Sequence, residues 1–97
     1  MTLYRVRYTP TASGSIRHLH PSVKQAIREA IRGLSNDPFR GHALTFELSG
    51  FRSQRISRYR VSYRVDESKR AVEIHLVGAR KDIYEVFRQL IDLAPRS

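Results

Sequence analysis

One run near the middle of the chain alternates strictly between two kinds of side chain. Tyr59, Val61, Tyr63 and Val65 occupy the apolar positions, and arginine or serine fills each position between them. A period of two is typical of a β-strand that buries one face and exposes the other. The chain is therefore expected to form a sheet with one face buried under helices and an arginine-rich face towards solvent.

Two helical segments precede this run. Apolar residues that recur every three or four positions predict a long helix, which begins at Pro21 and is stopped by residues 36–38. A shorter helix is expected over residues 10–19, with Thr9 as its cap. Alternation over residues 4–8 predicts a strand before both helices.

Further strands and a last helix complete the expected order of elements. Strands are predicted over residues 44–48, 52–56, 59–65 and 72–76, and a C-terminal helix is predicted to begin at Asp82. Short turns join the last three strands, which makes them an antiparallel meander. This order indicates an α+β fold: a mainly antiparallel, twisted sheet with two N-terminal helices packed on it and a C-terminal helix.

Composition limits what such a fold can contain. The 97 residues include 18 Lys+Arg and 9 Asp+Glu, a formal net charge of +9, and their number predicts a single domain over residues 1–97. Because there is no cysteine, disulfides, thiolate metal sites and cysteine nucleophiles are excluded. No stretch approaches the ~20 apolar residues that span a bilayer, and the N-terminus lacks the core of a signal peptide. A cytoplasmic protein without membrane contact is expected.

The excess of positive charge points to a polyanionic partner. If Arg58, Arg60 and Arg64 alternate on one strand they share a face, and Arg52 or Arg55 of the preceding strand can lie across from them. Guanidinium groups bind phosphate oxygens in a bidentate manner. Charge alone does not decide between a phosphate site and a solvated face that keeps the protein soluble.

Other polar residues give weaker signals. The four histidines lack the spacing of metal ligands, and no glycine-rich phosphate loop or nucleophile elbow is present, so neither a metal nor a cofactor is expected. His75 shares a strand face with Glu73, which makes it a reserve general acid or base. Tyr84 follows Arg80 by four residues, with Lys81 between them, and spacing alone favours an ordinary packed tyrosine.

Taken in order, several of these segments resemble a known family. Residues 48–66 and 77–84, together with residues 8–12 and 36–38, are similar to the core signature of the RelE/ParE superfamily, the toxins of type II toxin-antitoxin systems, and closer to its RelE branch. The resemblance implies a toxin that its cognate antitoxin wraps in a hetero-oligomer. In the RelE branch it also implies cleavage of mRNA on the ribosome. The basic surface adds the expectation that the antitoxin is acidic.

The resemblance also assigns roles to individual residues. Arg60 matches the arginine of the family's Tyr-Arg pair, Arg80 the arginine after the last strand, and Tyr84 the tyrosine that opens the final helix. Arg55 matches one of two basic residues on the preceding strand. These four form the expected catalytic set. The expected phosphate-binding residues are Arg52, Arg58, Arg64 and Lys81.

Three positions depart from the family pattern. Ser53 stands where the second basic residue is usual, so either Arg52 substitutes for it or the basic pair is incomplete. Ala79 stands where many relatives carry histidine, and Ser57 replaces a common turn glycine. These departures bear on the efficiency of catalysis more than on the fold.

Such a site can cleave RNA without a metal ion. The ribose 2′-hydroxyl attacks the adjacent phosphate, and arginines stabilise the charge that develops; tyrosine and arginine are poor free bases, so no general base is assigned. One alternative is a ParE-like toxin that binds and inhibits DNA gyrase, and another is a noncatalytic nucleic-acid-binding module. The retained Arg60, Arg80 and Tyr84 favour the ribonuclease. Solvation or ribosome docking is the expected role of three cations on the outer face of the long helix: Lys24, Arg28 and Arg32.

Overall fold

The computed structural model describes residues 3–45 and 48–79. The elements in this part of the chain are β1 (Arg5–Tyr8), α1 (Pro10–Arg17), α2 (Pro21–Asn36), β2 (His42–Ala43), β3 (Arg52–Ile56), β4 (Tyr59–Asp66) and β5 (Ala71–Ala79). The strands form one sheet in the order β1-β5-β4-β3-β2. β1 runs parallel to β5, and the other neighbouring strands are antiparallel. The predicted α+β fold with a mainly antiparallel sheet is confirmed.

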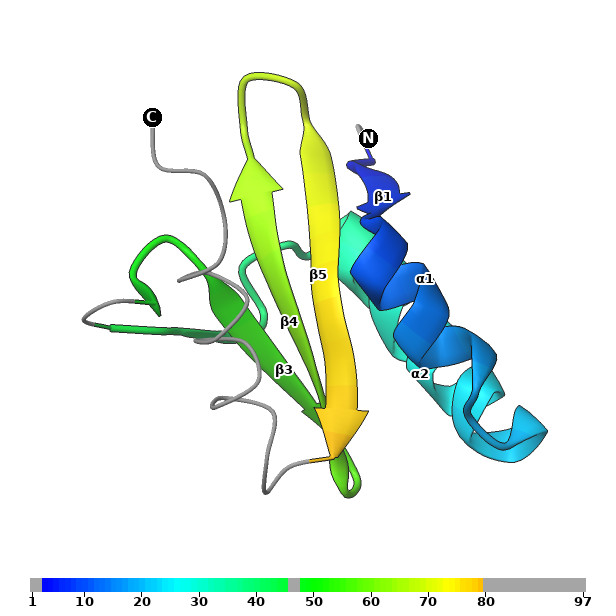
Figure 1. The fold of residues 1–97 in the computed structure, drawn as a ribbon. Coiled ribbons are helices and arrows are strands. Elements are labelled where there is room, and N and C mark those ends of the chain that lie inside the picture. Colours follow the sequence, from blue (N-terminus) through cyan, green and yellow to red (C-terminus); the bar gives the residue numbers. More distant parts are fainter. Residues whose placement is uncertain (1–2, 46–47, 80–97) are drawn as a thin grey trace.

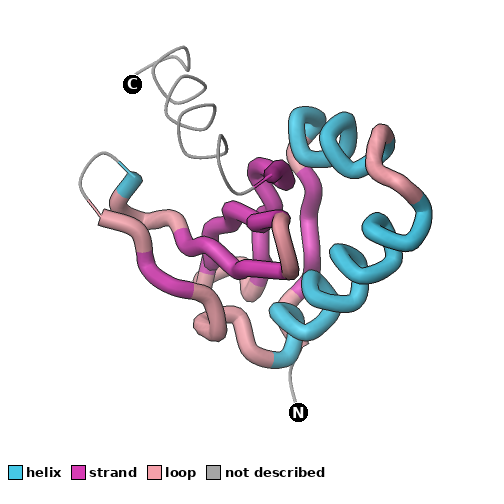
Figure 2. Tube along the Cα trace, turned by 90° about the horizontal axis from the view of Figure 1, so that it is seen from below, coloured by secondary structure: helices cyan, strands magenta, loops and turns pink. Residues whose placement is uncertain are grey.

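Both helices lie on one side of the sheet (Figure 1), and a second view shows the cyan helices gathered beside the magenta strands (Figure 2). Thr9 fixes where α1 begins. Its Oγ1 accepts a hydrogen bond from the backbone N–H of Ala12 at 3.1 Å, and its hydroxyl donates to the carbonyl of His75 at 3.2 Å. One side chain therefore caps the helix and ties it to β5. α2 has the predicted bounds, whereas α1 ends at Arg17 rather than at residue 19.

The main hydrophobic core lies between the helices and the sheet, with Tyr63 fully buried in it. The Tyr63 hydroxyl donates to the carbonyl of Pro38 at 2.8 Å and accepts from the backbone N–H of Gly41 at 2.9 Å. A Cβ on Gly41 would lie 2.7 Å from both the Tyr63 hydroxyl and the Ser53 carbonyl oxygen, so only glycine fits here. The other buried members are Ala12, Ile16, Ile27, Ile31, Leu34, Val61, Val72, Ile74 and Val77.

A β-bulge changes which face the side chains of β5 occupy. Ser62 of β4 pairs with Leu76 and Tyr63 pairs with Ile74, so His75 is the extra residue. Before the bulge, Ile74 belongs to the core beneath the helices; after it, Leu76 belongs to a different cluster. The expected continuous alternation over residues 72–76 is therefore wrong at its last position.

Leu76 contributes to a second apolar cluster, on the face of the sheet that points away from the helices. Leu48 is buried with it, and Leu44 and Phe51 pack against these two residues. The ring of Phe51 also meets the ring of His75 edge to face, with 5.1 Å between the centroids. The face of the sheet that carries the arginines therefore also has an apolar part, in which Leu48 and Leu76 are buried.

The strand predicted over residues 44–48 is wrong at its described positions, residues 44, 45 and 48. The described residues that pair with β3 here are His42–Ala43, which form β2. The backbone N–H of Leu48 donates to the carbonyl of Thr45 at 3.1 Å. Leu44 and Leu48 belong to the second apolar cluster.

The β3–β4 connection is a two-residue turn, Ser57 and Arg58, between the paired residues Ile56 and Tyr59. Ser57 has φ 55°, in the left-handed region where glycine has no steric penalty. The residue that departs from the family's turn glycine thus occupies a conformation that glycine prefers. A turn this short fixes the register of β3 against β4.

Two further predictions concern the helices. The C-terminal helix expected from Asp82 lies outside the described residues. Within the described part, neither α1 nor α2 has the length and apolarity needed to cross a membrane.

Candidate functional site

The face of the sheet away from the helices carries two arginines side by side. Arg55 of β3 and Arg60 of β4 pair directly, and Gly78 of β5 lies on the other side of Arg60. Residues opposite each other in an antiparallel pair have Cβ atoms about 4.5–5.5 Å apart on one face. Arg55 and Arg60, hereafter the arginine pair, are two of the four predicted catalytic residues. The strand pattern predicts that Arg52 or Arg55 lies across from the arginines of the next strand, and the pairing shows that Arg55 lies across from Arg60.

Arg60 is the more firmly held member of the arginine pair. It is half-buried, and its Nη1 donates to Oγ of the fully buried Ser53 at 3.4 Å. Arg55 is exposed, and its Nε donates to the carbonyl of Ser57 at 3.4 Å. A guanidinium held in place beforehand loses less rotamer freedom when it binds phosphate. Ser53 therefore contributes to the site as an acceptor for Arg60, a role that its residue type alone did not reveal.

Arg52 lies on the opposite face of the sheet. It pairs with the buried Tyr63, and its Nη2 donates to the carbonyls of Phe39 at 2.9 Å and Gly41 at 2.6 Å. Its guanidinium carbon lies 5.3 Å from the centroid of the Phe39 ring. Of the alternatives that the sequence leaves open, Arg52 is neither the residue across from the other arginines nor a replacement for a basic residue at Ser53. Strand alternation directs it to the helix side, where the loop after α2 binds it.

Arg58 and Arg64 are separated from the arginine pair. Arg58 is exposed in the β3–β4 turn and not on the strand. Arg64 is exposed and pairs with Glu73 of β5, which in turn pairs with Arg7 of β1. Arg64 shares the face of Arg60, as expected, because the two alternate along β4, whereas the expectation is wrong for Arg58. The face around Arg64 is balanced in charge, because Arg64 belongs to a row in which a carboxylate separates two cations.

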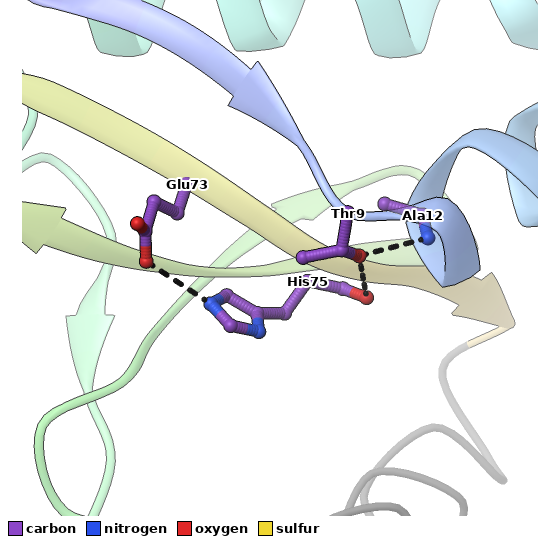
Figure 3. A network of polar contacts seen from close by, with 4 residues as sticks. All are labelled: Thr9, Ala12, Glu73 and His75. Atoms are coloured by element: carbon purple, nitrogen blue, oxygen red, sulfur yellow. Dashed lines mark hydrogen bonds and ion pairs between the residues drawn. The ribbon is translucent and has the colours of Figure 1, made fainter.

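His75 and Glu73 lie beside each other, as Figure 3 shows, with 3.5 Å between Nε2 and Oε1. The prediction that they share a face is confirmed. Burial lowers the pKa of His75, the hydrogen bond and charge of Glu73 oppose this, and Arg64 adds to the lowering. The net direction is downward, so the imidazole is neutral at neutral pH. A hollow of about 310 Å³ adjoins this pair and is also lined by Arg7, Tyr8 and Thr9.

The lowered pKa of His75 predicts a pH dependence of stability. The unfolded chain binds this proton near pH 6.5, and the folded chain binds it only at lower pH. The unfolded state therefore holds more protons in this window, so the free energy of unfolding falls as the pH drops below about 6.5 and levels off below the folded-state pKa. Thermal melts from pH 7.5 to pH 5 check this prediction. The His75→Gln variant should flatten the profile, whereas His42→Gln, at an exposed position, should leave it unchanged.

Three residues of the predicted site, Arg80, Lys81 and Tyr84, lie outside the described residues. Within residues 3–45 and 48–79, no three histidine or acidic side chains gather in a way that could hold a metal ion. The described part of the site therefore consists of the arginine pair, with Ser53 beneath Arg60 and the Glu73 and His75 contact further along β5.

Comparisons with known proteins match this arrangement to a toxin family. The family model described as ParE toxin of type II toxin-antitoxin system, parDE, matches residues 6–84. Toxin RelG of Mycobacterium tuberculosis is 41% identical over 83 residues, which cover 84% of this chain and 95% of the relative. Toxin RelE of the same organism is 34% identical over 85 residues, which cover 86% of this chain and 88% of the relative.

A solved structure gives the same answer. The crystal structure of the toxin-antitoxin complex RelBE2 from Mycobacterium tuberculosis contains a chain that is 39% identical, with a TM-score of 0.77. The match covers 84% of this chain and 97% of that one. Because a family model, two sequence relatives and this structure agree over most of the chain, the protein belongs to the RelE/ParE superfamily of toxins from type II toxin-antitoxin systems, nearer to its RelE branch.

Proposed function

We propose that this toxin is a ribosome-dependent endoribonuclease, which cuts mRNA without a metal ion and thereby inhibits translation. The observation that carries the proposal is the arginine pair, in which Arg55 and Arg60 lie directly opposite each other on one strand pair. Like charges placed this way destabilise a sheet. A phosphate between two guanidinium groups removes that repulsion and accepts their hydrogen bonds.

The reaction follows from what these groups can do. The 2′-hydroxyl gives up its proton as its oxygen bonds to phosphorus, and the 5′-oxygen takes up a proton as its bond to phosphorus breaks. The products are a 2′,3′-cyclic phosphate and a 5′-hydroxyl. Arg60, held by Ser53, and Arg80 stabilise the charge on the phosphorane, and one preorganised donor is worth about 3–4 kcal/mol. Arg55 binds the same phosphate from β3. Tyr84 stacks on a base or takes part in proton transfer.

His75 lies on β5 three positions before Gly78, the residue that pairs with Arg60. The proposal assigns it no step of the reaction. RNA held on the ribosome reaches the site already oriented, so the toxin's own residues need not hold the RNA in the reactive geometry.

We also propose that a cognate acidic antitoxin neutralises the toxin in a hetero-oligomer. The net charge of +9 favours an acidic partner, and the related RelBE2 structure is a toxin-antitoxin complex. Co-expression with the small protein encoded next to the toxin gene tests this point. The two proteins should copurify and the message should stay intact; a neighbouring protein that neither copurifies nor protects the message contradicts it.

Message mapping on translating ribosomes tests the nuclease. The purified toxin should produce cuts at the ribosomal A site, and none should appear on the same message without ribosomes. Arg80→Ala should reduce cutting at least about tenfold, since it removes one donor to the transition state. Intact messages together with inhibited DNA gyrase would overturn the nuclease and support the gyrase-binding alternative.

A further inference from the structure

We propose that Ser62 is a positioning residue of the proposed reaction: its hydroxyl replaces Arg60 as the donor to Ser53 when Arg60 turns to the phosphate. Ser62 lies directly opposite Ser53 on the β3–β4 pair and two positions after Arg60 on β4. Alternation along both strands places these three side chains on the face that points away from the helices. The inference rests on the proposed function, because it concerns how Arg60 is released to the message.

Ser62 has a buried hydroxyl that folding alone does not explain. The residue is 0% exposed, and within the described part of the chain its Oγ makes no hydrogen bond. Its neighbour on β5 is Leu76, a member of the second apolar cluster. A buried hydroxyl without a partner destabilises the folded state, and alanine fits the same space without that cost. The hydroxyl therefore has its use in a state other than the free toxin.

The hydrogen bond between Arg60 and Ser53 is long enough to be given up. Arg60 Nη1 lies 3.4 Å from Ser53 Oγ, whereas N–H···O bonds in proteins are usually about 2.7–3.2 Å long. A phosphate oxygen is a charged acceptor, and its bonds to a guanidinium are shorter and stronger. Phosphate at the arginine pair therefore draws Nη1 away from Ser53. Because Ser53 is 0% exposed, bulk water does not reach the lone pair that Arg60 leaves.

Ser62 is placed to donate to that lone pair. Residues opposite each other on antiparallel strands have Cβ atoms about 4.5–5.5 Å apart, and serine hydroxyls form hydrogen bonds across such pairs. Rotation about the Cα–Cβ bond carries the Ser62 hydroxyl between staggered positions, and its proton turns to suit the acceptor. Ser62 Oγ–H then donates to Ser53 Oγ.

The exchange makes the release of Arg60 less costly. Before the phosphate arrives, Ser53 orients the guanidinium, and the Ser62 hydroxyl has no partner among the described residues. Once phosphate is bound, Arg60 donates to the phosphate and Ser62 donates to Ser53. The buried hydroxyl of Ser62 is thus satisfied only in the phosphate-bound state, so the exchange favours binding.

Phosphate binding to the full chain tests the inference without any cleavage. Inorganic phosphate is titrated into the toxin, and NMR follows the serine Cβ signals, which report rotation of the side chain. The signals of Ser53 and Ser62 should shift together in the unchanged toxin and stay in place in Arg60→Ala. Ser62→Ala should bind phosphate about tenfold more weakly, because no hydroxyl replaces Arg60 on Ser53.

Thermal melts separate a positioning role from a structural one. Ser62→Ala should melt about 4 °C higher or more, since a buried hydroxyl without a partner is removed. Ser35→Ala is the control, because its hydroxyl donates to the Tyr4 carbonyl at 2.6 Å. The control should melt lower and bind phosphate normally. A structural serine loses stability when its hydroxyl is removed, whereas Ser62 should gain stability and lose phosphate affinity.

The double variant S53A/S62A should bind phosphate as tightly as Ser53→Ala, since the exchange requires the Ser53 oxygen. A tenfold loss in both backgrounds, unchanged affinity in Ser62→Ala, or a lower melting temperature in Ser62→Ala overturns the inference. On translating ribosomes Ser62→Ala should cut messages about tenfold more slowly. A toxin that shows the phosphate exchange but cuts no message contradicts the nuclease proposal alone. A toxin that cuts messages equally well with and without the Ser62 hydroxyl contradicts the inference alone.

Discussion

Replacing Tyr63 with phenylalanine is expected to lower the free energy of unfolding by about 2–4 kcal/mol, although the ring and its packing are kept. The hydroxyl donates to the Pro38 carbonyl and accepts from the Gly41 N–H, and both bonds are buried. Phenylalanine leaves one donor and one acceptor without a partner, at about 1–3 kcal/mol each. Domains of this size are stable by only about 5–15 kcal/mol, so the loss is a large share of the total.

Urea denaturation measures this change, and Tyr59→Phe is the matched control. Tyr59 begins the same strand and points to the same face, but it is only partly buried. We expect the control to change stability by less than about 0.5 kcal/mol. Equal losses of stability in the two variants would show that the hydrogen bonds of Tyr63 to the loop after α2 do not stabilise the fold.

Replacing Arg60 with alanine is expected to slow message cleavage on the ribosome about 100- to 1,000-fold. Arg60 is the member of the arginine pair that has a buried acceptor beneath it, so it reaches the phosphate already oriented. Arg60→Lys should also be slower, by about tenfold or more, because an ammonium cannot bind two phosphate oxygens in a planar fork. Single-turnover cleavage of a defined message on stalled ribosomes measures both rates.

The fold should survive these changes. Arg60→Ala removes one of two like charges that lie opposite each other, so its melting temperature should not fall by more than a few degrees. Arg5→Ala, an exposed cation on β1, is the control and should cut at the normal rate. If Arg60→Ala cuts messages as fast as the unchanged toxin, the arginine pair has no part in the chemistry.

The parts of the fold that could be predicted are those that depend on residues close together in the sequence. The apolar positions from Tyr59 to Val65 alternate without interruption, and the structure places all of them in or against the main core. The bulge at His75 depends on how two strands are paired, which no periodicity within one strand reveals. The neighbouring residues Leu76 and Val77 are both buried, and a regular strand that exposes one face would bury only one of them. Two consecutive apolar residues are therefore the sign of the bulge that the sequence carries.

The same distinction between local and tertiary signals applies to the site. The strand pattern leaves Arg52 or Arg55 as the residue opposite the arginines of β4, and the register set by the two-residue turn places Arg55 opposite Arg60. Arg52 has the same residue type on the same strand, but an odd number of positions separates it from Arg55, which directs it to the other face. Its partners are carbonyl groups of the loop after α2, and only the tertiary fold brings that loop to β3.

The parallel pairing of β1 with β5 determines when the sheet of the toxin can form during synthesis. Arg5 pairs with Ala71, so β1 can join the sheet only after β5, the last described strand, has been synthesised. β5 also lies between β1 and β4, so β1 has no place in the sheet beside the strands that carry Arg55 and Arg60 until β5 has been made. Contacts this distant in sequence form late and slowly. The complete sheet therefore forms only after most of the described chain has been synthesised.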